Sequence, residues 1–333
     1  MKKWQIPFLA ILIVGTILII RQQQNMPYQR CSGLIFGTTY SIIYQYDEDL
    51  HPELLKRLKD VDAALSMFNE ESTISKINQN EDIKPNQMFL DVFQLAQEIS
   101  ADTDGAFDIT VAPLVNLWGF GFKHDIEPDR QSIDSLRQFI GWQKVSYEGG
   151  RIVKKDPRIM LDCSAIAKGY GADVAARLLD EKGVKNYLVE IGGEVVSRGV
   201  SEKRVPWKIG VVKPTEEPQL DSHEMQTILN VTDKAMATSG NYRNFYYKGG
   251  RKYAHTIDPA TGRPVQHNIL SATVLCNRCA KADAYATAFM VMGLEKAQKV
   301  LDRNPDLMVY FIYDNNGKND VWYSPSLKEK ILP

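Results

Sequence analysis

An aspartate and a threonine stand four residues apart in the alanine-rich, apolar stretch KADAYATAF, residues 281–289. Alanines and large apolar residues at this density predict a helix that is buried against a core. Positions i and i+4 share one helix face, so Asp283 and Thr287 point the same way, inward. A buried carboxylate without a partner is costly. Either a hard cation such as Mg²⁺, which suits carboxylate and hydroxyl oxygens, or a salt bridge or cap within the fold would compensate it.

A histidine stands just before a turn in the stretch HTIDPATGRP, residues 255–264. The order Asp-Pro-x-Thr-Gly is turn chemistry, in which Asp258 can bond backbone N–H groups. Histidine titrates near neutral pH and suits acid–base catalysis, which makes His255 a candidate catalytic residue. A structural histidine is the alternative.

Three further stretches could contact a ligand. The segment GAFDITVAPLVNLWGFG, residues 105–121, has glycines and aromatics that suit a flat ring stacked near backbone donors, or an irregular core segment. In the stretch LDCSAIAKGY, residues 161–170, small residues precede a predicted helix. The N–H groups at the start of that helix and the charge of Lys168 would suit a phosphate. The spacing of the stretch is not that of a Walker loop. The glycines of EIGGE, residues 190–194, indicate either a close ligand or a plain tight turn.

The elements that must position these residues alternate between hairpins and helices. Helical spacing is found at residues 52–68, 88–103, 132–140, 166–181, 280–292 and 294–302, and strand patterns at 32–46, 159–162, 207–212, 226–232, 236–240, 270–276 and 307–313. Turn residues predict hairpins at 145–153, 187–198 and 242–257, and residues 105–121 read as a loop-rich segment. Antiparallel hairpins with inserted helices predict an α+β fold.

The N-terminus has the pattern of a membrane anchor. Two lysines precede an apolar run from Ile6 to Ile20, and no small-x-small cleavage site follows it. The run is near the lower length limit for a membrane span, and the lysines favour an N-terminus inside and a body outside. We therefore expect residues 1–30 to be an anchor and linker, and 31–333 to be one domain outside the inner membrane. Whether the anchor is cleaved stays open.

The composition excludes one class of partner and leaves one redox question open. The 40 Lys and Arg residues against 41 Asp and Glu residues give a net charge of −1. Without a basic excess or stripe, nucleic acid is not an expected partner. Cys276 and Cys279 form a single C-x-x-C pair, which supports a zinc site poorly and is compatible with a disulfide or with free thiols.

Six stretches taken in order resemble one family. GAFDITVAPLVNLWGFG, AIAKGYGAD, YLVEIGGEVVSRG, ATSGNYRN, HTIDPATGRP and KADAYATAFMVMG are similar to the motifs of the ApbE family, the FAD:protein FMN transferases. The resemblance spans residues 33–327. It implies a single catalytic domain of the T-fold-like ApbE type.

The resemblance implies a specific reaction. Family members bind FAD and, with Mg²⁺, transfer its FMN half to a threonine or serine hydroxyl of a partner flavoprotein, and AMP leaves. Exported members modify membrane redox complexes such as the sodium-pumping NADH:quinone oxidoreductase and the related Rnf complex. An anchor at the inner membrane, with the catalytic domain on the periplasmic side, would keep the enzyme near such acceptors.

The family's functional positions carry over residue by residue. The metal ligands map onto Asp283, Thr287 and the backbone carbonyl of Ala167, and the general base onto His255. The FAD contacts map onto Phe36, Phe68, Ala106, Phe107, Asp108, Ser164, Tyr170 and Ile257. Lys168 is added on physical grounds, as a charge near the pyrophosphate. Two departures concern the FAD geometry: Cys163 and Ser164 replace glycines that are common in the family, and Ala254 replaces a common second histidine.

Two other functions would use many of the same residues. An FAD pyrophosphatase would release FMN and AMP into solution, with water in place of the protein hydroxyl. A membrane-tethered flavin carrier would bind FAD without cleaving it. The joint presence of Asp283, Thr287 and His255 argues against a carrier, which needs no metal and base.

Overall fold

The computed structural model describes residues 8–9, 11–16, 26–120, 128–214, 224–241, 245–248, 251–254 and 256–332, with the backbone alone for 245–248 and 251–254. Its main sheet has eight antiparallel strands in the order β1-β2-β5-β6-β9-β14-β15-β16. The bounds of these strands are β1 Tyr28–Ile35, β2 Thr38–Gln45, β5 Tyr187–Ile191, β6 Glu194–Arg198, β9 Ala235–Gly240, β14 Ile269–Cys276, β15 Met308–Asn315 and β16 Lys318–Tyr323.

Smaller sheets and the helices complete the described part. The three-stranded sheet β17-β8-β7 consists of Ile331–Leu332, Met225–Asn230 and Lys208–Val212, and the pairs are β3 Val145–Glu148 with β4 Arg151–Lys154, β10 Phe245–Lys248 with β11 Arg251–Ala254, and β12 Ile257–Asp258 with β13 Arg263–Pro264. The helices are α2 His51–Leu65, α3 Thr73–Asn78, α4 Gln87–Asp102, α5 Ala112–Leu117, α6 Arg130–Arg137, α7 Ser164–Glu181, α8 Cys279–Met292 and α9 Leu294–Arg303, with 3-10 turns η1 Trp142–Lys144 and η2 Pro325–Lys330.

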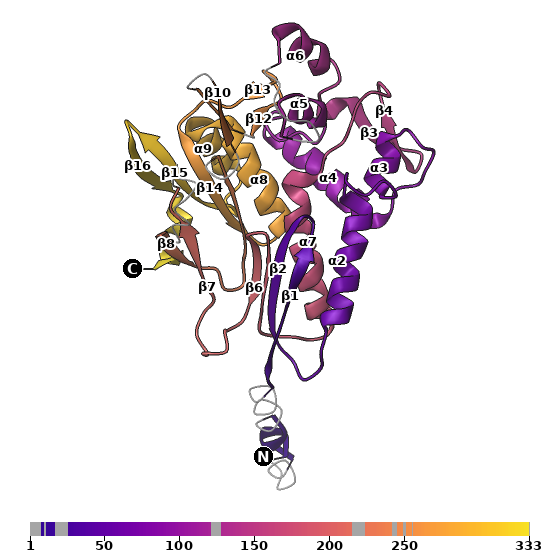
Figure 1. Cartoon of the computed structure of the whole chain (residues 1–333). Coiled ribbons are helices and arrows are strands. Elements are labelled where there is room, and N and C mark those ends of the chain that lie inside the picture. Colours follow the sequence, from indigo (N-terminus) through magenta and orange to yellow (C-terminus); the bar gives the residue numbers. More distant parts are fainter. Residues whose placement is uncertain are drawn as a thin grey trace.

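The main sheet is covered on both faces. Strand β14 is almost wholly buried, and successive side chains of a strand point to opposite faces. Accordingly Val274 packs in the cluster that contains α4, α7 and α8, whereas Leu275 packs with the residues of β7 and β8. The helices therefore form one outer layer and the small sheet forms the other, as Figure 1 shows. The largest core lies between the main sheet and its helices.

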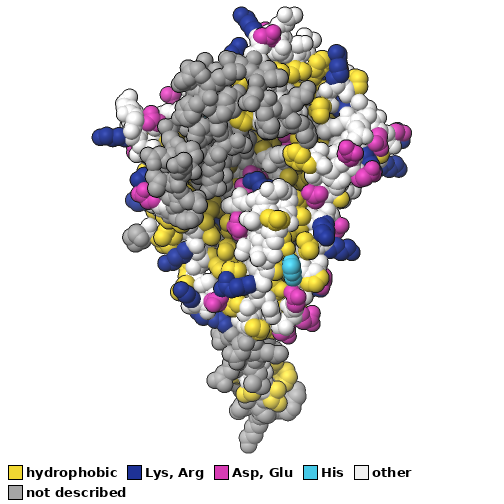
Figure 2. Space-filling model, in the orientation of Figure 1, with side chains coloured by type: hydrophobic (Ala, Val, Ile, Leu, Met, Phe, Trp, Pro, Cys, Tyr) yellow, Lys and Arg dark blue, Asp and Glu magenta, His cyan; other side chains and the backbone are white. Residues whose placement is uncertain are grey.

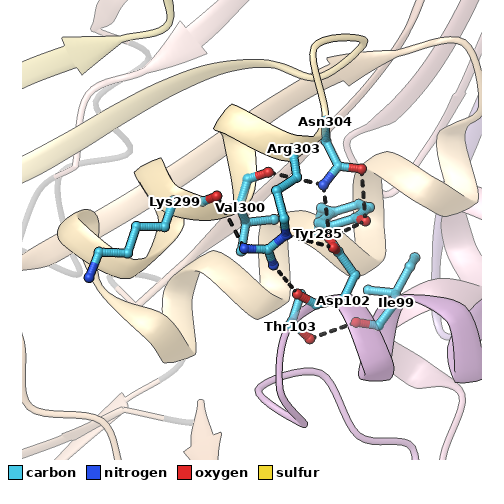
Figure 3. Close-up of polar contacts among 8 residues, drawn as sticks. All are labelled: Ile99, Asp102, Thr103, Tyr285, Lys299, Val300, Arg303 and Asn304. Atoms are coloured by element: carbon cyan, nitrogen blue, oxygen red, sulfur yellow. Dashed lines mark hydrogen bonds and ion pairs between the residues drawn. The ribbon is translucent and has the colours of Figure 1, made fainter.

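Helix α8 is buried nearly all round and is held in place at its N-terminus and near its middle. At its N-terminus the carboxylate of Asp173, on α7, accepts from the N–H of Cys279 at 2.7 Å and of Ala280 at 3.0 Å. Farther along, the Tyr285 hydroxyl donates to Asp102, at the end of α4, at 2.8 Å (Figure 3). Asn304, just after α9, donates to the same carboxylate at 2.9 Å. These contacts fix the rotation of α8 about its own axis.

The predicted α+β class and the hairpins at residues 145–153 and 187–198 are confirmed. The prediction of one strand over residues 32–46 is wrong, because β1 and β2 form a hairpin. Its two turn residues, Phe36 and Gly37, both have positive φ, of 53° and 71°. A phenylalanine gives no signal for such a turn, since bulky residues rarely adopt positive φ.

Two other expectations also differ from the structure. The segment 105–121, which was expected to be loop-rich, contains the short helix α5, whose second residue is Pro113. Residues 159–162 form no strand. Instead, Leu161 is bonded through its backbone to the side chain of Asn78, and Asp162 donates its N–H to the carbonyl of Ile109 at 2.7 Å. These tertiary contacts satisfy the backbone in place of a strand partner.

The N-terminal expectation is tested only in part. Strand β1 begins at Tyr28, so residues 28–30 of the expected linker pair with β2 in the main sheet. The expected anchor falls partly outside the described residues. In the part of the chain that is described, no helix combines the length and the apolar character that crossing a membrane requires.

Candidate functional site

A close crossing of α7 and α8 forms the floor of the site. A Cβ atom on Gly169 would lie 2.5 Å from the carbonyl oxygen of Cys279 and 2.9 Å from the Cα of Ala280, so only glycine permits this approach. The crossing brings the N–H of Gly169 to 3.0 Å from Oδ2 of Asp283, to which it donates. The packing of the two helices and the position of the carboxylate therefore depend on the same glycine.

Asp283 and Thr287 face the same cavity, as their spacing predicts. Asp283 is only 3% exposed, and no donor among the described residues contacts its Oδ1. Burial raises the pKa of Asp283, against the opposing effects of the Lys168 charge and the Gly169 N–H. The Thr287 hydroxyl lies 3.1 Å from the hydroxyl of Ser239 on β9. The floor thus offers a free carboxylate oxygen and a hydroxyl one helical turn away.

A second buried carboxylate lies close by. Glu194, the first residue of β6, is 2% exposed, and its Oε1 is 2.6 Å from the ammonium of Lys168. Its Oε2 is buried and has no hydrogen-bond partner among the described residues. Burial and the charge of Asp283 raise the pKa of Glu194, against the effect of Lys168. Two buried carboxyl groups thus lie near one ammonium group, and Glu194 is the one that forms the ion pair with it.

The cavity above this floor has a volume of about 430 Å³. Nine of the predicted site residues line it: Phe68, Ala106, Phe107, Asp108, Ser164, Lys168, Ile257, Asp283 and Thr287. In Figure 2 this face of the molecule is hollowed near its centre, over the region where α7 and α8 meet in Figure 1, and basic and acidic side chains lie together at the edge of the hollow. A cavity of this size is within the range of small-molecule sites.

The walls combine apolar surface with fixed backbone. Phe68, which is 74% exposed, follows α2, while Phe107 and Ile257 are buried. Asp108 accepts from the N–H and hydroxyl of Thr110 at 2.8 and 2.7 Å and from the N–H of Trp142 at 2.9 Å. Burial raises the pKa of Asp108, and these hydrogen bonds oppose the rise. Asp108 therefore braces the wall with both of its oxygens.

Three predicted residues are not brought to the cavity. Phe36 packs on α7, where a Cβ on Gly171 would lie 2.5 Å from its ring. The Tyr170 hydroxyl donates to Asp91 of α4 at 2.8 Å, and the side chain lines a different hollow. Ala167 lies in the first turn of α7, next to Lys168, and is not among the residues that line the cavity.

His255 lies outside the described residues. Its neighbour Thr256 lines the cavity and donates its hydroxyl to Asn241 at 2.7 Å. The turn that follows is tied to the residue after α5, because the indole N–H of Trp118 donates to the carbonyl of Gly262 at 2.8 Å. Ile257 of β12, two positions after the predicted base in the sequence, lines the cavity.

Sequence reasoning missed several residues of the site. Glu194 is not among the predicted site residues, although a carboxylate directly after the tight turn of EIGGE is itself a signal. Asp162 also lines the cavity, where its Oδ1 accepts from the N–H of Ser164 at 2.7 Å. Ser239, beside Thr287, belongs to the quoted motif ATSGNYRN and was not assigned a role.

The donor set at the floor fits a hard cation. No group of three or more His, Cys, Asp or Glu side chains among the described residues could hold a metal ion by itself. Mg²⁺ does not require such a cage, because one or two carboxylates together with substrate phosphates and water usually bind it. The free Oδ1 of Asp283 and the Thr287 hydroxyl are suitable for that mode of binding.

Comparison with known proteins gives one consistent result. The family model described as ApbE family matches residues 36–311. The chain is 36% identical over 322 residues to the FAD:protein FMN transferase of Vibrio cholerae, covering 93% of this chain and 94% of that protein. It is 35% identical over 293 residues to the protein of the same name from Escherichia coli, covering 85% and 82%.

Solved structures agree with this result. The flavin transferase ApbE from Vibrio cholerae superposes with a TM-score of 0.83 at 36% identity, covering 91% of this chain and 99% of that one. The apo form of the Pseudomonas stutzeri flavinyl transferase ApbE superposes with a TM-score of 0.82 at 31% identity, covering 91% and 96%.

Proposed function

Because the chain belongs to the ApbE family, we propose that it transfers the FMN half of FAD to a hydroxyl group of a partner protein. The acceptor is the threonine or serine side chain of a flavoprotein, and AMP is the second product. The observation that carries the proposal is the cavity floor, where Asp283 and Thr287 lie beside Lys168. The flavin transferases to which the chain is similar support the reaction class.

Mg²⁺ is part of the proposal. Asp283 and Thr287 would hold it with oxygen ligands, and the carbonyl of Ala167 is the third ligand that the resemblance assigns. When bound, the cation supplies positive charge that stabilises the charge developing on the phosphate oxygens. The free Oδ1 of Asp283 and the Thr287 hydroxyl one helical turn away support this assignment.

The protein residues have separate tasks in the transfer. Lys168 stabilises negative charge on the diphosphate, and Phe68, Phe107 and Ile257 provide apolar surface for the flavin. His255 takes the proton of the acceptor hydroxyl, whose oxygen forms a bond to the phosphorus of FMN. The anhydride bond to AMP breaks, and AMP leaves with the electron pair. The number of phosphate ester bonds formed equals the number of anhydride bonds broken.

A mass-spectrometric assay tests the proposal. The full chain is incubated with FAD, MgCl₂ and an acceptor domain that carries the target threonine, and the masses of all products are measured. We expect the acceptor to gain the mass of one FMN, and we expect this gain to be lost with EDTA, in Asp283→Asn and in His255→Asn. Asp306→Asn, which removes a carboxylate that pairs with Lys281 on the surface, is the matched control and keeps activity.

Other outcomes of the same assay contradict the proposal. Free FMN and AMP at the same rate without acceptor would identify an FAD pyrophosphatase. Intact FAD in every sample, despite tight binding, would identify a flavin carrier.

We further propose that the chain acts at the outer face of the inner membrane, held there by its apolar N-terminal segment. The sodium-pumping NADH:quinone oxidoreductase and Rnf-type complexes are the proposed acceptors. The seven residues between Ile20 and Tyr28 can span at most about 25 Å, which would keep the domain close to the membrane surface. Membrane fractionation, followed by protease treatment of spheroplasts, tests this placement. Recovery of the intact chain in the soluble fraction would contradict it.

A further inference from the structure

The Lys168–Glu194 pair has a feature that the transfer reaction does not explain. Glu194 is one of the least exposed charged side chains of the described residues, and it contributes one oxygen to Lys168 and leaves the other without a partner. Lys168 itself is 31% exposed at its side chain and reaches into the cavity. Glu194 therefore determines where the ammonium group of Lys168 is held.

The turn before β6 is shaped to let Lys168 reach Glu194. Gly192 has a φ of +61°, and a Cβ there would lie 3.2 Å from Cδ of Lys168 and 2.8 Å from Cγ2 of Thr38. A side chain at this position would be strained and would crowd the path of the lysine. The glycine of EIGGE thus clears a route between the first turn of α7 and the buried carboxylate.

Asp283 competes for the same ammonium group. Its Oδ2 accepts from the N–H of Gly169, the residue directly after Lys168. This bond holds the Asp283 carboxylate close to the backbone that carries Lys168. Burial lowers the pKa of Lys168, but the charges of Asp283 and Glu194 outweigh burial and hold it above its ordinary value. If Glu194 lost its charge, Asp283 would be the buried anion left to pair with Lys168.

We propose that Glu194 is a positioning residue that holds the Lys168 ammonium group away from Asp283 and so keeps the Asp283 carboxylate free for a divalent cation. This inference rests on the proposed function, because it takes Asp283 to be a metal ligand. In this arrangement the ion pair between Lys168 and Glu194 prevents an ion pair between Lys168 and Asp283. Removing Glu194 lets Lys168 occupy the carboxylate and displace the cation.

Metal binding measured without catalysis tests the inference. Mn²⁺ is titrated into the full chain in mild detergent without FAD, and free Mn²⁺ is followed by EPR. We expect Glu194→Gln to weaken Mn²⁺ binding by about 10–100-fold, the usual effect of losing a partner that supports a metal ligand. In the double variant with Lys168→Met, the competing ammonium is gone, and we expect the affinity to return to nearly that of the wild type.

A control and a conservative variant separate positioning from net charge. Glu53 pairs with Lys182, just after the other end of α7, at the same 2.6 Å, so Glu53→Gln removes an equivalent carboxylate at the surface and should leave Mn²⁺ binding unchanged. Glu194→Asp keeps the charge but shortens the side chain by one methylene group. We expect it to weaken binding, because the carboxylate no longer reaches Lys168. Circular dichroism verifies that each variant is folded. If Glu194→Gln does not fold, Glu194→Asp is the variant whose Mn²⁺ affinity tests the proposal.

The outcomes distinguish the inference from the proposed function. Unchanged Mn²⁺ binding in Asp283→Asn would refute the metal site of the proposed function. Loss in Asp283→Asn with wild-type affinity in both Glu194 variants would refute the positioning role alone. A loss in Glu194→Gln that Lys168→Met does not restore would show that Glu194 binds the cation itself, which also overturns the inference.

Discussion

Replacing Gly169 by alanine tests whether the helix crossing controls both stability and the site. The new Cβ would lie 2.5 Å from the carbonyl oxygen of Cys279, whereas ordinary contacts begin at 3.4 Å, so the backbones must separate by roughly 0.9 Å. All three nearest atoms belong to backbone and cannot rotate away. Overpacking of this kind costs about 1–3 kcal/mol, and alanine recovers about 1 kcal/mol through its helix propensity. We expect a net loss of about 0–2 kcal/mol, toward the upper end because the clashing atoms are backbone.

Gly171→Ala is the matched control for this change. It lies in the same helix and gains the same propensity, but its Cβ meets the ring of Phe36, which can move. Urea unfolding of both variants, followed by circular dichroism, gives the two free energies of unfolding. Because the separation also lengthens the bond from the Gly169 N–H to Asp283, Mn²⁺ binding should weaken only in Gly169→Ala. A Gly169→Ala variant as stable as Gly171→Ala, with wild-type metal affinity, would refute the reasoning.

Three further predictions follow from other contacts. Burial raises the pKa of Asp173 from the ordinary value of 3.8 to about 6. The folded protein therefore holds this proton more tightly than the unfolded chain does, and it loses stability as the pH rises from about 4 to about 6. The urea midpoint of Asp173→Asn should decrease less than that of the wild type over the same pH range. Trp118→Phe leaves the buried carbonyl of Gly262 without its donor, which should cost about 1–3 kcal/mol in the free energy of unfolding, and an unchanged midpoint would contradict the bond. All four cysteines are free and three of them are buried. Iodoacetamide should therefore label the three buried cysteines slowly in the native protein, and all four fully in urea. A protein mass two units lower, with two cysteines that stay unlabelled in urea, would instead show a disulfide.

Periodicity predicted the elements whose local signals are strong. Helix α8 extends over residues 279–292 where 280–292 was expected, because an alanine-rich apolar run of this length has few alternatives. The same pattern placed Asp283 and Thr287 on one face. The turn at Phe36 was not predictable, since its positive φ is imposed by the pairing of β1 with β2 and not by the residue type.

The site as a whole could be predicted only through resemblance. Residues more than a hundred positions apart meet in the cavity, as Lys168 and Asp283 do, and no local pattern encodes such a contact. The partner of Lys168 shows the limit clearly. A glutamate directly after a glycine pair can face either side of its strand, and only the packed sheet shows that Glu194 is buried under the cavity.

The contacts between α7 and α8 also bear on motion. Asp173 binds the N-terminus of α8, Gly169 binds Asp283 farther along, and Tyr285 ties the same helix to α4. Helices joined at several points along their length move as one rigid body, without a hinge between them. In the proposed reaction the floor is therefore a fixed reference for the diphosphate, and any closure on FAD must come from the walls that carry Phe68 and Phe107.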